Sequence, residues 1–326
     1  MRFLRRIGVD TYMLLLISMV GLGIVFPASG VAATGLKFLT FWAVALLFFL
    51  YGAKLDPQSM RAGLLNWRLQ GLTLLATYLM LPLIGVTLAA VFGPLLGVTV
   101  TLGLLFLSVL PSTVQSSIAF TSISGGNVPA AICAASTSNI LGVFLTPLLM
   151  AVLMHQGGGG LRLDAVIKIG TQILAPFVVG QLVRPFIGAF VLRHRTATMV
   201  VDRGSILMIV YSAFSAGTVG GLWSAIPVSS LLSLFGVVWL FLAINLLLMP
   251  FAGRVLGLVY EDRTVVLYVG ATKSLASGLP IAAALFDPEM VGAIVLPVMI
   301  YHMSQLLVCA FIAQRLAQSN SHRVII

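Results

Sequence analysis

The sequence predicts an all-α polytopic membrane protein, and three observations lead to that fold class. Hydrophobic residues fill 60% of the 326 positions and charged residues only 8%, whereas soluble domains carry about 25% charged residues. The mean hydropathy is +1.13, so the chain cannot cover a water-facing surface and must use lipid as its solvent. The apolar stretches are also continuous rather than alternating, which excludes a transmembrane barrel.

Proline, glycine and charged residues divide the chain into ten apolar segments, which we interpret as transmembrane helices. The segments are 12–26, 36–51, 69–92, 97–122 and 128–154, followed by 165–186, 205–223, 228–259, 264–286 and 290–316. The first segment follows three arginines and is also similar to a signal peptide. We favour a first span there, because the topology below requires one.

The distribution of Lys and Arg predicts the orientation. With a cytoplasmic N-terminus, fourteen of the 18 Lys and Arg residues fall on the inside, Lys37, Arg162 and Lys168 fall outside, and Lys273 lies within a span. This asymmetry follows the positive-inside rule, so it predicts ten spans with both termini cytoplasmic. We therefore expect an integral protein of the plasma membrane, which in a bacterium is the inner membrane.

The chain also repeats itself about a glycine linker at 157–160. The sequence LMLPLIG at 79–85 returns as LLMPFAG at 247–253, and a Val-Gly pair leads to a proline at both 20–27 and 179–185. Residues 1–156 and 161–326 would then each hold five spans. Because five is odd, the second repeat enters the membrane inverted, which is typical of alternating-access secondary transporters.

Two spans are interrupted by polar residues, the fourth by PSTVQSS from position 111 and the ninth by GATKSLASG from position 270. Lys273 is a lone cation there, and none of the eight acidic residues lies in an apolar segment where it could neutralise the charge. A lysine at mid-bilayer costs about 2.5–3.5 kcal/mol on insertion scales. Such a residue is typical of a functional site.

The polar run from Pro111 to Pro147 and the run from Thr272 to Gly278 resemble the bile acid:sodium symporter family, and more narrowly its SBF-like branch. That branch includes a vertebrate member tied to calcium homeostasis. The resemblance covers essentially the whole chain. It implies a panel domain of spans 1, 2, 6 and 7, and a core domain of spans 3–5 and 8–10 in which the broken fourth and ninth helices cross.

Positions carried over from the family, together with the polar residues near them, give the candidate site. The candidate substrate- and ion-binding residues are Ser112, Thr113, Gln115, Ser116, Ser117, Asn127, Ser136, Thr137, Asn139, Lys273, Ser274, Ser277, His302 and Gln305. The resemblance implies a sodium site at Ser116 and Ser117. However, the family's sodium-binding Glu and Gln align with Lys273 and Ser277, and an ammonium cannot ligate Na⁺. The alternative is a purely structural role, in which these hydroxyls only permit close helix packing.

Three interpretations of Lys273 stay open at this point. The ammonium replaces sodium by donating to helix C-terminal carbonyls, it binds an anionic substrate, or it loses its proton during transport because burial favours a neutral amine. We accordingly expect a secondary transporter of an organic, anionic solute, with Na⁺ or H⁺ as the coupling ion. Alternatives are a regulatory membrane protein that affects calcium homeostasis without moving solute, and a channel.

Other classes of function find no support in the sequence. The basic residues sit in short loops, which argues against nucleic-acid binding, and Cys133 and Cys309 lie in apolar segments, where we expect reduced packing residues. Enzyme motifs and intramembrane carboxylate pairs are also missing, so we expect neither an enzyme nor a tightly bound cofactor. A site of Ser, Thr and Asn has no unique chemical complement, so the solute stays open, as does the oligomeric state.

Overall fold

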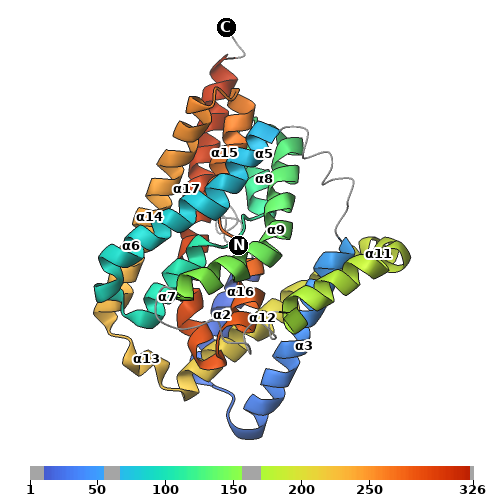
Figure 1. Cartoon of the computed structure of the whole chain (residues 1–326), viewed down its shortest axis with the longest axis vertical. Coiled ribbons are helices and arrows are strands. Elements are labelled where there is room, and N and C mark those ends of the chain that lie inside the picture. Colours follow the sequence, from blue (N-terminus) through green and yellow to red (C-terminus); the bar gives the residue numbers. More distant parts are fainter. Residues whose placement is uncertain (1–10, 55–66, 156–169, 324–326) are drawn as a thin grey trace.

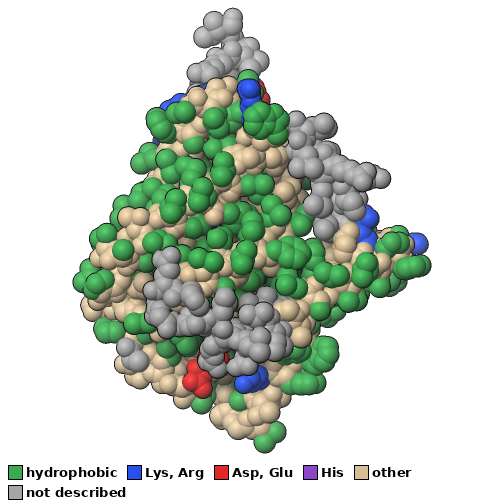
Figure 2. Space-filling view, in the orientation of Figure 1, with side chains coloured by type: hydrophobic (Ala, Val, Ile, Leu, Met, Phe, Trp, Pro, Cys, Tyr) green, Lys and Arg blue, Asp and Glu red, His purple; other side chains and the backbone are tan. Residues whose placement is uncertain are grey.

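The computed structural model describes residues 11–54, 67–155 and 170–323, and every regular element in these ranges is a helix (Figure 1). Eight of the helices are long and apolar enough to cross a membrane, and two shorter apolar helices cover Leu14–Val25 and Val98–Val109. Hydrophobic side chains cover most of the visible face, and charged ones gather near its edges (Figure 2). The protein is therefore a multi-pass membrane protein.

The first half of the chain begins with a short helix and a long one and ends with another long helix. Its elements are α2 (Thr11–Val25), α3 (Gly30–Lys54), α5 (Trp67–Leu75), the π-helical turn η1 (Ala76–Met80), α6 (Leu81–Leu96), α7 (Val98–Ser108), α8 (Gln115–Ile123) and α9 (Val128–His155). Helices α5, η1 and α6 run on as one span of 30 residues, Trp67–Leu96. Gly97 has φ +78° between α6 and α7, a conformation that favours glycine and allows the tight turn.

The second half follows the same order of long and interrupted helices. Its elements are the π-helical turn η2 (Gly170–Leu174), α11 (Ala175–Arg193), α12 (Arg195–Val219), the short α13 (Leu222–Ala225), α14 (Val228–Val255), α15 (Tyr260–Ala271), α16 (Leu275–Leu285) and α17 (Pro288–Arg323). The start of the predicted sixth span, before residue 170, and the glycine linker lie outside the described residues.

Each predicted span contains helix in the described residues, but the fourth and ninth are each divided into two helices and some boundaries were wrong. The seventh span was predicted at 205–223, whereas α12 covers Arg195–Val219. The predicted span started too late in the chain because the charged residues Asp202 and Arg203 indicate a span boundary there. Those charges are accommodated, because Asp202 binds the Lys54 ammonium at 2.5 Å and Arg203 lies over the Tyr12 ring. Helix α17 likewise continues to Arg323, past the predicted end at 316.

Helices α2, α3, α11 and α12 pack against one another, with α3 along α11 and α2 along α12 (Figure 1). The backbones of α3 and α11 touch. A Cβ at Gly52 would lie 2.1 Å from the Phe177 carbonyl oxygen, and one at Gly180 would lie 2.0 Å from that of Phe49. Small residues permit this approach, which stabilises helix pairs in lipid through close packing.

The interrupted helix α15–α16 occupies the centre of the remaining helices. In its apolar window 89% of the residues are buried, against 22–44% in the other seven long spans. Helices α5, α8, α9, α14 and α17 all contact α15 or α16. The side chains of this span therefore meet protein rather than lipid, and this span carries Lys273.

Candidate transport site at a helix crossing

The two interrupted helices lie against each other where their regular structure stops. Residues 109–114 separate α7 from α8, and residues 272–274 separate α15 from α16. Pro111 has no amide hydrogen and disfavours helix at the residue before it, which ends α7 locally. Thr272 and Ser274 are extended, and the Ser274 amide donates to the Pro111 carbonyl oxygen at 2.8 Å. One break therefore completes the backbone hydrogen bonding of the other.

Four buried hydroxyls fill the contact between the breaks. The Thr272 hydroxyl lies 3.0 Å from that of Ser112, 2.9 Å from that of Thr113 and 2.8 Å from that of Ser117. Thr113 and Ser117 are themselves 2.9 Å apart, and the Ser116 hydroxyl donates to Thr113 at 2.7 Å. The Ser116 and Ser117 hydroxyls, which the resemblance assigns to sodium, thus both bond to the Thr113 hydroxyl in this structure.

The Lys273 side chain is fully buried, and its three ammonium protons have three acceptors. The ammonium donates to the carbonyl oxygens of Ser108 and Leu110 at 2.7 Å each, and to that of Thr77 at 3.2 Å. Ser108 is the last residue of α7, where unpaired carbonyls carry the negative end of the helix dipole. Thr77 lies in the π-helical turn η1. Hydrogen bonds to a charged group contribute about 1.5–3 kcal/mol each, so the carbonyls offset the burial of the charge.

A second set of bonds fixes the backbone of Lys273. The Gln305 side-chain oxygen accepts from the Lys273 amide at 2.8 Å, and its nitrogen donates to the Lys273 carbonyl at 2.9 Å. The His302 Nδ1 lies 2.9 Å from the Gln305 nitrogen and 3.5 Å from the same carbonyl. Helix α17 therefore holds the break of α15–α16 by a bidentate amide contact.

Asn139 on α9 bridges both breaks. Its side-chain nitrogen donates to the Ser112 carbonyl at 2.7 Å, and its oxygen accepts from the Ser277 hydroxyl at 2.7 Å. The neighbouring Ser138 hydroxyl accepts from the Ser112 amide at 3.1 Å. Ser274 caps α16, since its side-chain oxygen accepts from the Ser277 amide. The first turn of α16 and the break before α8 are thus both fixed to α9.

Most of the candidate residues meet at this crossing, and four do not contribute to it. The crossing contains Ser112, Thr113, Ser116, Ser117, Asn139, Lys273, Ser274, Ser277, His302 and Gln305. Gln115 is the exposed first residue of α8, and Ser136 and Thr137 are half-buried on α9 outside the network above. Asn127 was misplaced. Its side chain caps α9 through the Ala130 amide and binds Asp262 at 2.8 Å, near the start of α15.

Several groups at the crossing were not predicted from the sequence. The Thr272 hydroxyl stands at its centre, although its position beside Lys273 was a usable signal. The Tyr301 hydroxyl donates to the Ala271 carbonyl at 2.5 Å and accepts from Asn245 at 3.0 Å, and the Tyr78 hydroxyl donates to the Ser138 carbonyl. The backbone carbonyls that accept from Lys273 cannot be predicted from residue type, because every residue has a carbonyl group.

A buried charge at the meeting point of two interrupted helices, inside a multi-pass helical bundle, defines an architecture typical of secondary transporters. The SBF-like CPA transporter family matches residues 10–318 of the chain. The chain belongs to this family, which confirms the resemblance drawn from the polar runs of spans four and nine. Membership of a transporter family also confirms that the protein is not an enzyme.

Relatives agree with that assignment. The chain is 46% identical over 310 residues to an uncharacterized protein of Pseudomonas aeruginosa, covering 95% of this chain and 93% of that one. It is 42% identical over 306 residues to the "Putative symporter YfeH" of Escherichia coli K12, covering 94% and 92%. A rat protein named sodium/bile acid cotransporter 7 is 28% identical over 171 residues, or 52% of this chain and 50% of that protein.

Proposed function

We propose that the protein is a secondary active transporter that moves an organic, anionic solute by alternating access. The observation that carries the proposal is the enclosed Lys273 ammonium, which donates to the carbonyl of Ser108 at the end of α7 and to that of Leu110 in the break that follows. A charge without a carboxylate partner is costly to bury within a membrane, so a purely structural role does not explain it. Interrupted helices with midplane charges are, in contrast, a recurrent feature of transporters.

The packing of the helices supports an arrangement of ten spans in two inverted repeats of five. Such a repeat relates span 1 to span 6, span 2 to span 7, and so on through the chain. The contact between α3 (span 2) and α11 (span 6) then corresponds to a contact between α12 (span 7) and α2 (span 1). Both contacts are present in the structure. The pair α8 with α9 corresponds to α16 with α17, and α7 with α17 to α15 with α9, and these pairs are in contact too.

Glycine contacts repeat in the same way. Gly180 of α11 meets the backbone of α3, and Gly23 of α2 would place a Cβ 3.1 Å from the Tyr211 carbonyl of α12. On this basis we assign α2, α3, η2, α11 and α12 to a panel domain and the other long helices to a core domain. The distribution of basic residues supports a bacterial inner-membrane location with both termini in the cytoplasm.

We propose that Lys273 replaces the coupling sodium of the wider family. In this structure the ammonium has no free proton to offer a solute, because all three protons point at carbonyl oxygens and the side chain is 0% exposed. A fixed positive charge at the C-terminal end of α7 stabilises the negative end of the helix dipole, as a bound cation would. Direct binding of an anion by Lys273 and loss of its proton are therefore the weaker interpretations.

The anion would instead bind at the helix N-termini of the crossing. Helices α8 and α16 begin at Gln115 and Leu275, directly after the two breaks, and helix N-termini favour negative charge. Ser116 and Ser277 stand in these first turns and are half-buried, so their hydroxyls can donate to a solute once the domains part. The proposal thus separates the fixed cation from the solute-binding groups.

Uptake into proteoliposomes tests the proposal. Purified protein is reconstituted and offered radiolabelled taurocholate, succinate and L-lactate, with protein-free liposomes as the control. We expect saturable uptake of at least one anion. If correctly folded protein moves none of them, transport of organic anions is wrong and a regulatory role is favoured. A steady, non-saturating conductance in planar bilayers would instead identify a channel.

A further inference from the structure

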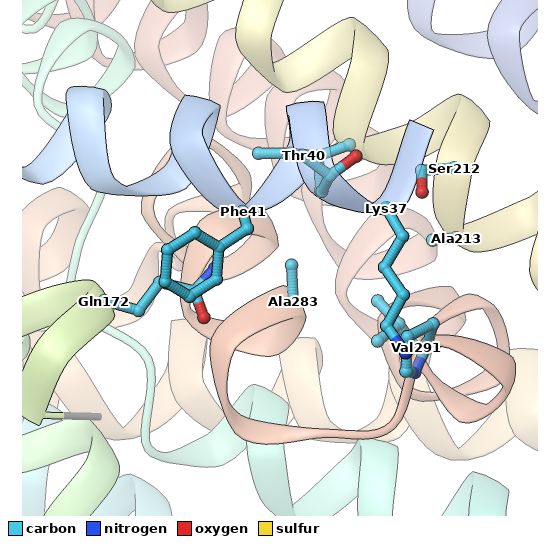
Figure 3. Close-up of a pocket in the computed structure, with 10 residues that line it drawn as sticks. Lys37, Thr40, Phe41, Gln172, Ser212, Ala213, Ala283 and Val291 are labelled. Carbon is cyan, nitrogen blue, oxygen red and sulfur yellow. The ribbon is translucent and has the colours of Figure 1, made fainter. Parts of the chain in front are cut away.

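A small cavity of about 80 Å³ lies away from the crossing, between the proposed panel and core helices (Figure 3). Helices α3 and α12 and the turn η2 form one side, and the end of α16 and the start of α17 form the other. Its polar lining is Lys37, Thr40, Gln172 and Ser212. Since Ala283 lies nine residues beyond Ser274, the cavity is about 13 Å along α16 from the break.

Charge and unpaired polar atoms distinguish this cavity from a packing defect. Lys37 is exposed and extends from α3 toward Val291 at the start of α17 (Figure 3). No ion pair joins Lys37 to a carboxylate of the described residues. Gln172 is 2% exposed and its side-chain oxygen has no hydrogen-bond partner, and the Thr40 hydroxyl is buried without one as well. A buried polar group without a partner costs about 1–3 kcal/mol.

The chemistry of these groups specifies a ligand. Lys37 requires a negative charge, and the Gln172 oxygen can only accept, so it requires a hydroxyl or amine donor. One water-sized group needs at least roughly 10–15 Å³, so a cavity of about 80 Å³ has room for at most about eight of them. That limit fits a hydroxy acid of three or four carbons and excludes a steroid skeleton.

We infer that this cavity is a recognition subsite for a small hydroxylated carboxylate, with Lys37 pairing the carboxylate and Gln172 accepting from the hydroxyl. The inference rests on the proposed function and narrows its solute class. Because the end of α16 lines the cavity and its start belongs to the crossing, a displacement of α16 against α3 and α12 would change both places together.

Reactivity of a single cysteine tests the charge preference of the cavity. Ser212→Cys is introduced into a chain whose Cys133 and Cys309 are replaced by alanine. Its reaction rate is measured by mass spectrometry with an anionic sulfonatoethyl and a cationic trimethylammonioethyl methanethiosulfonate. Lys37→Gln removes a unit charge from the lining of the cavity. A unit charge acting over on the order of 8 Å, at a dielectric constant between those of protein surface and water, changes the rate of a charged reagent about fivefold, so the anionic reagent should slow by that factor. Lys54→Gln removes a cation at the other end of α3 and should leave both rates unchanged.

Protection by ligands tests the chemical class. L-Lactate should slow the labelling, whereas propionate, which lacks the hydroxyl, and glycerol, which lacks the charge, should protect at least tenfold less well. Gln172→Leu should remove the distinction between lactate and propionate and keep the preference for the anionic reagent. Circular dichroism and size-exclusion profiles confirm that each variant folds.

Three outcomes would overturn the inference. Equal rates for the two reagents, each divided by its rate with a free thiol in solution, would show that no anion site exists. A charge preference without protection would show a solvent-filled vestibule only. Equal protection by lactate and propionate would remove the role of Gln172. Labelling and protection do not require flux, so a protein that moves no anion in liposomes but is protected by lactate would overturn transport and leave the subsite standing.

Discussion

If Lys273 replaces the coupling sodium as proposed, Lys273→Glu should give a protein that sodium stabilises, whereas sodium should leave the stability of the wild-type protein unchanged. The substitution removes the ammonium that donates to the carbonyls of Ser108, Leu110 and Thr77. It leaves a carboxylate beside carbonyls and hydroxyls, which are oxygen ligands that a hard cation can use. If the ammonium replaces a metal ion, a metal ion should be able to replace the ammonium.

The structure sets the size of the effect. Loss of the ammonium leaves three buried carbonyls without their donor, at about 1–3 kcal/mol each, while the burial cost of one charge, about 2.5–3.5 kcal/mol, disappears for a neutral replacement. Lys273→Ala should therefore lose between about 0 and 6 kcal/mol, stay folded and inserted, and fail to transport. Lys273→Glu should lose more without sodium, because the carboxylate then faces carbonyl oxygens.

Thermal unfolding in detergent provides the assay. Wild-type protein, Lys273→Ala and Lys273→Glu are each melted in sodium chloride and in choline chloride at equal ionic strength. We expect a sodium-dependent rise in melting temperature for Lys273→Glu only, growing with the logarithm of the sodium concentration. A wild-type protein that sodium stabilises would refute the reasoning, as would wild-type uptake by Lys273→Ala.

Other substitutions test the packing and the crossing. Gly180→Val should force α11 off the Phe49 carbonyl and lower the melting temperature strongly, at a cost of about 3 kcal/mol or more, and an unchanged melting temperature would show that the two helices do not touch. Asn139→Leu should lose about 2–4 kcal/mol in the same assay because Ser112 and the break of α16 lose their shared partner, and wild-type uptake would contradict its place in the site. Asp202→Asn breaks a partly exposed ion pair and should cost at most about 1 kcal/mol. If Asp202→Asn proved more destabilising than Asn139→Leu, the ranking would be wrong.

The sequence predicted the spans because lipid imposes a simple rule, namely a long apolar run bounded by charge or proline. The rule failed where charges are paired inside the bundle, as at Asp202, which shortened the predicted seventh span. The positions of both breaks were also predicted from the sequence, because Pro111 and the Gly/Ser-rich run around Lys273 are unfavourable inside a helix.

Individual contacts were harder to predict than positions. Lys273 was identified because it has no partner in sequence, but its partners are backbone carbonyls that leave no trace in residue type. Asn127 was assigned to the site on polarity alone, whereas an Asn directly before a helix is the ordinary N-cap, which it proves to be. Which hydroxyls touch depends on how two distant helices cross, and pattern alone does not specify that.

The central claim is that a lysine takes the place of the coupling sodium, and sodium replacement during uptake tests it most directly. Wild-type proteoliposomes are offered the transported anion with sodium on both sides, and then with choline in its place. The account predicts equal initial rates in the two media and no uptake by Lys273→Ala in either. Uptake by wild-type protein that falls to the protein-free level in choline would contradict it.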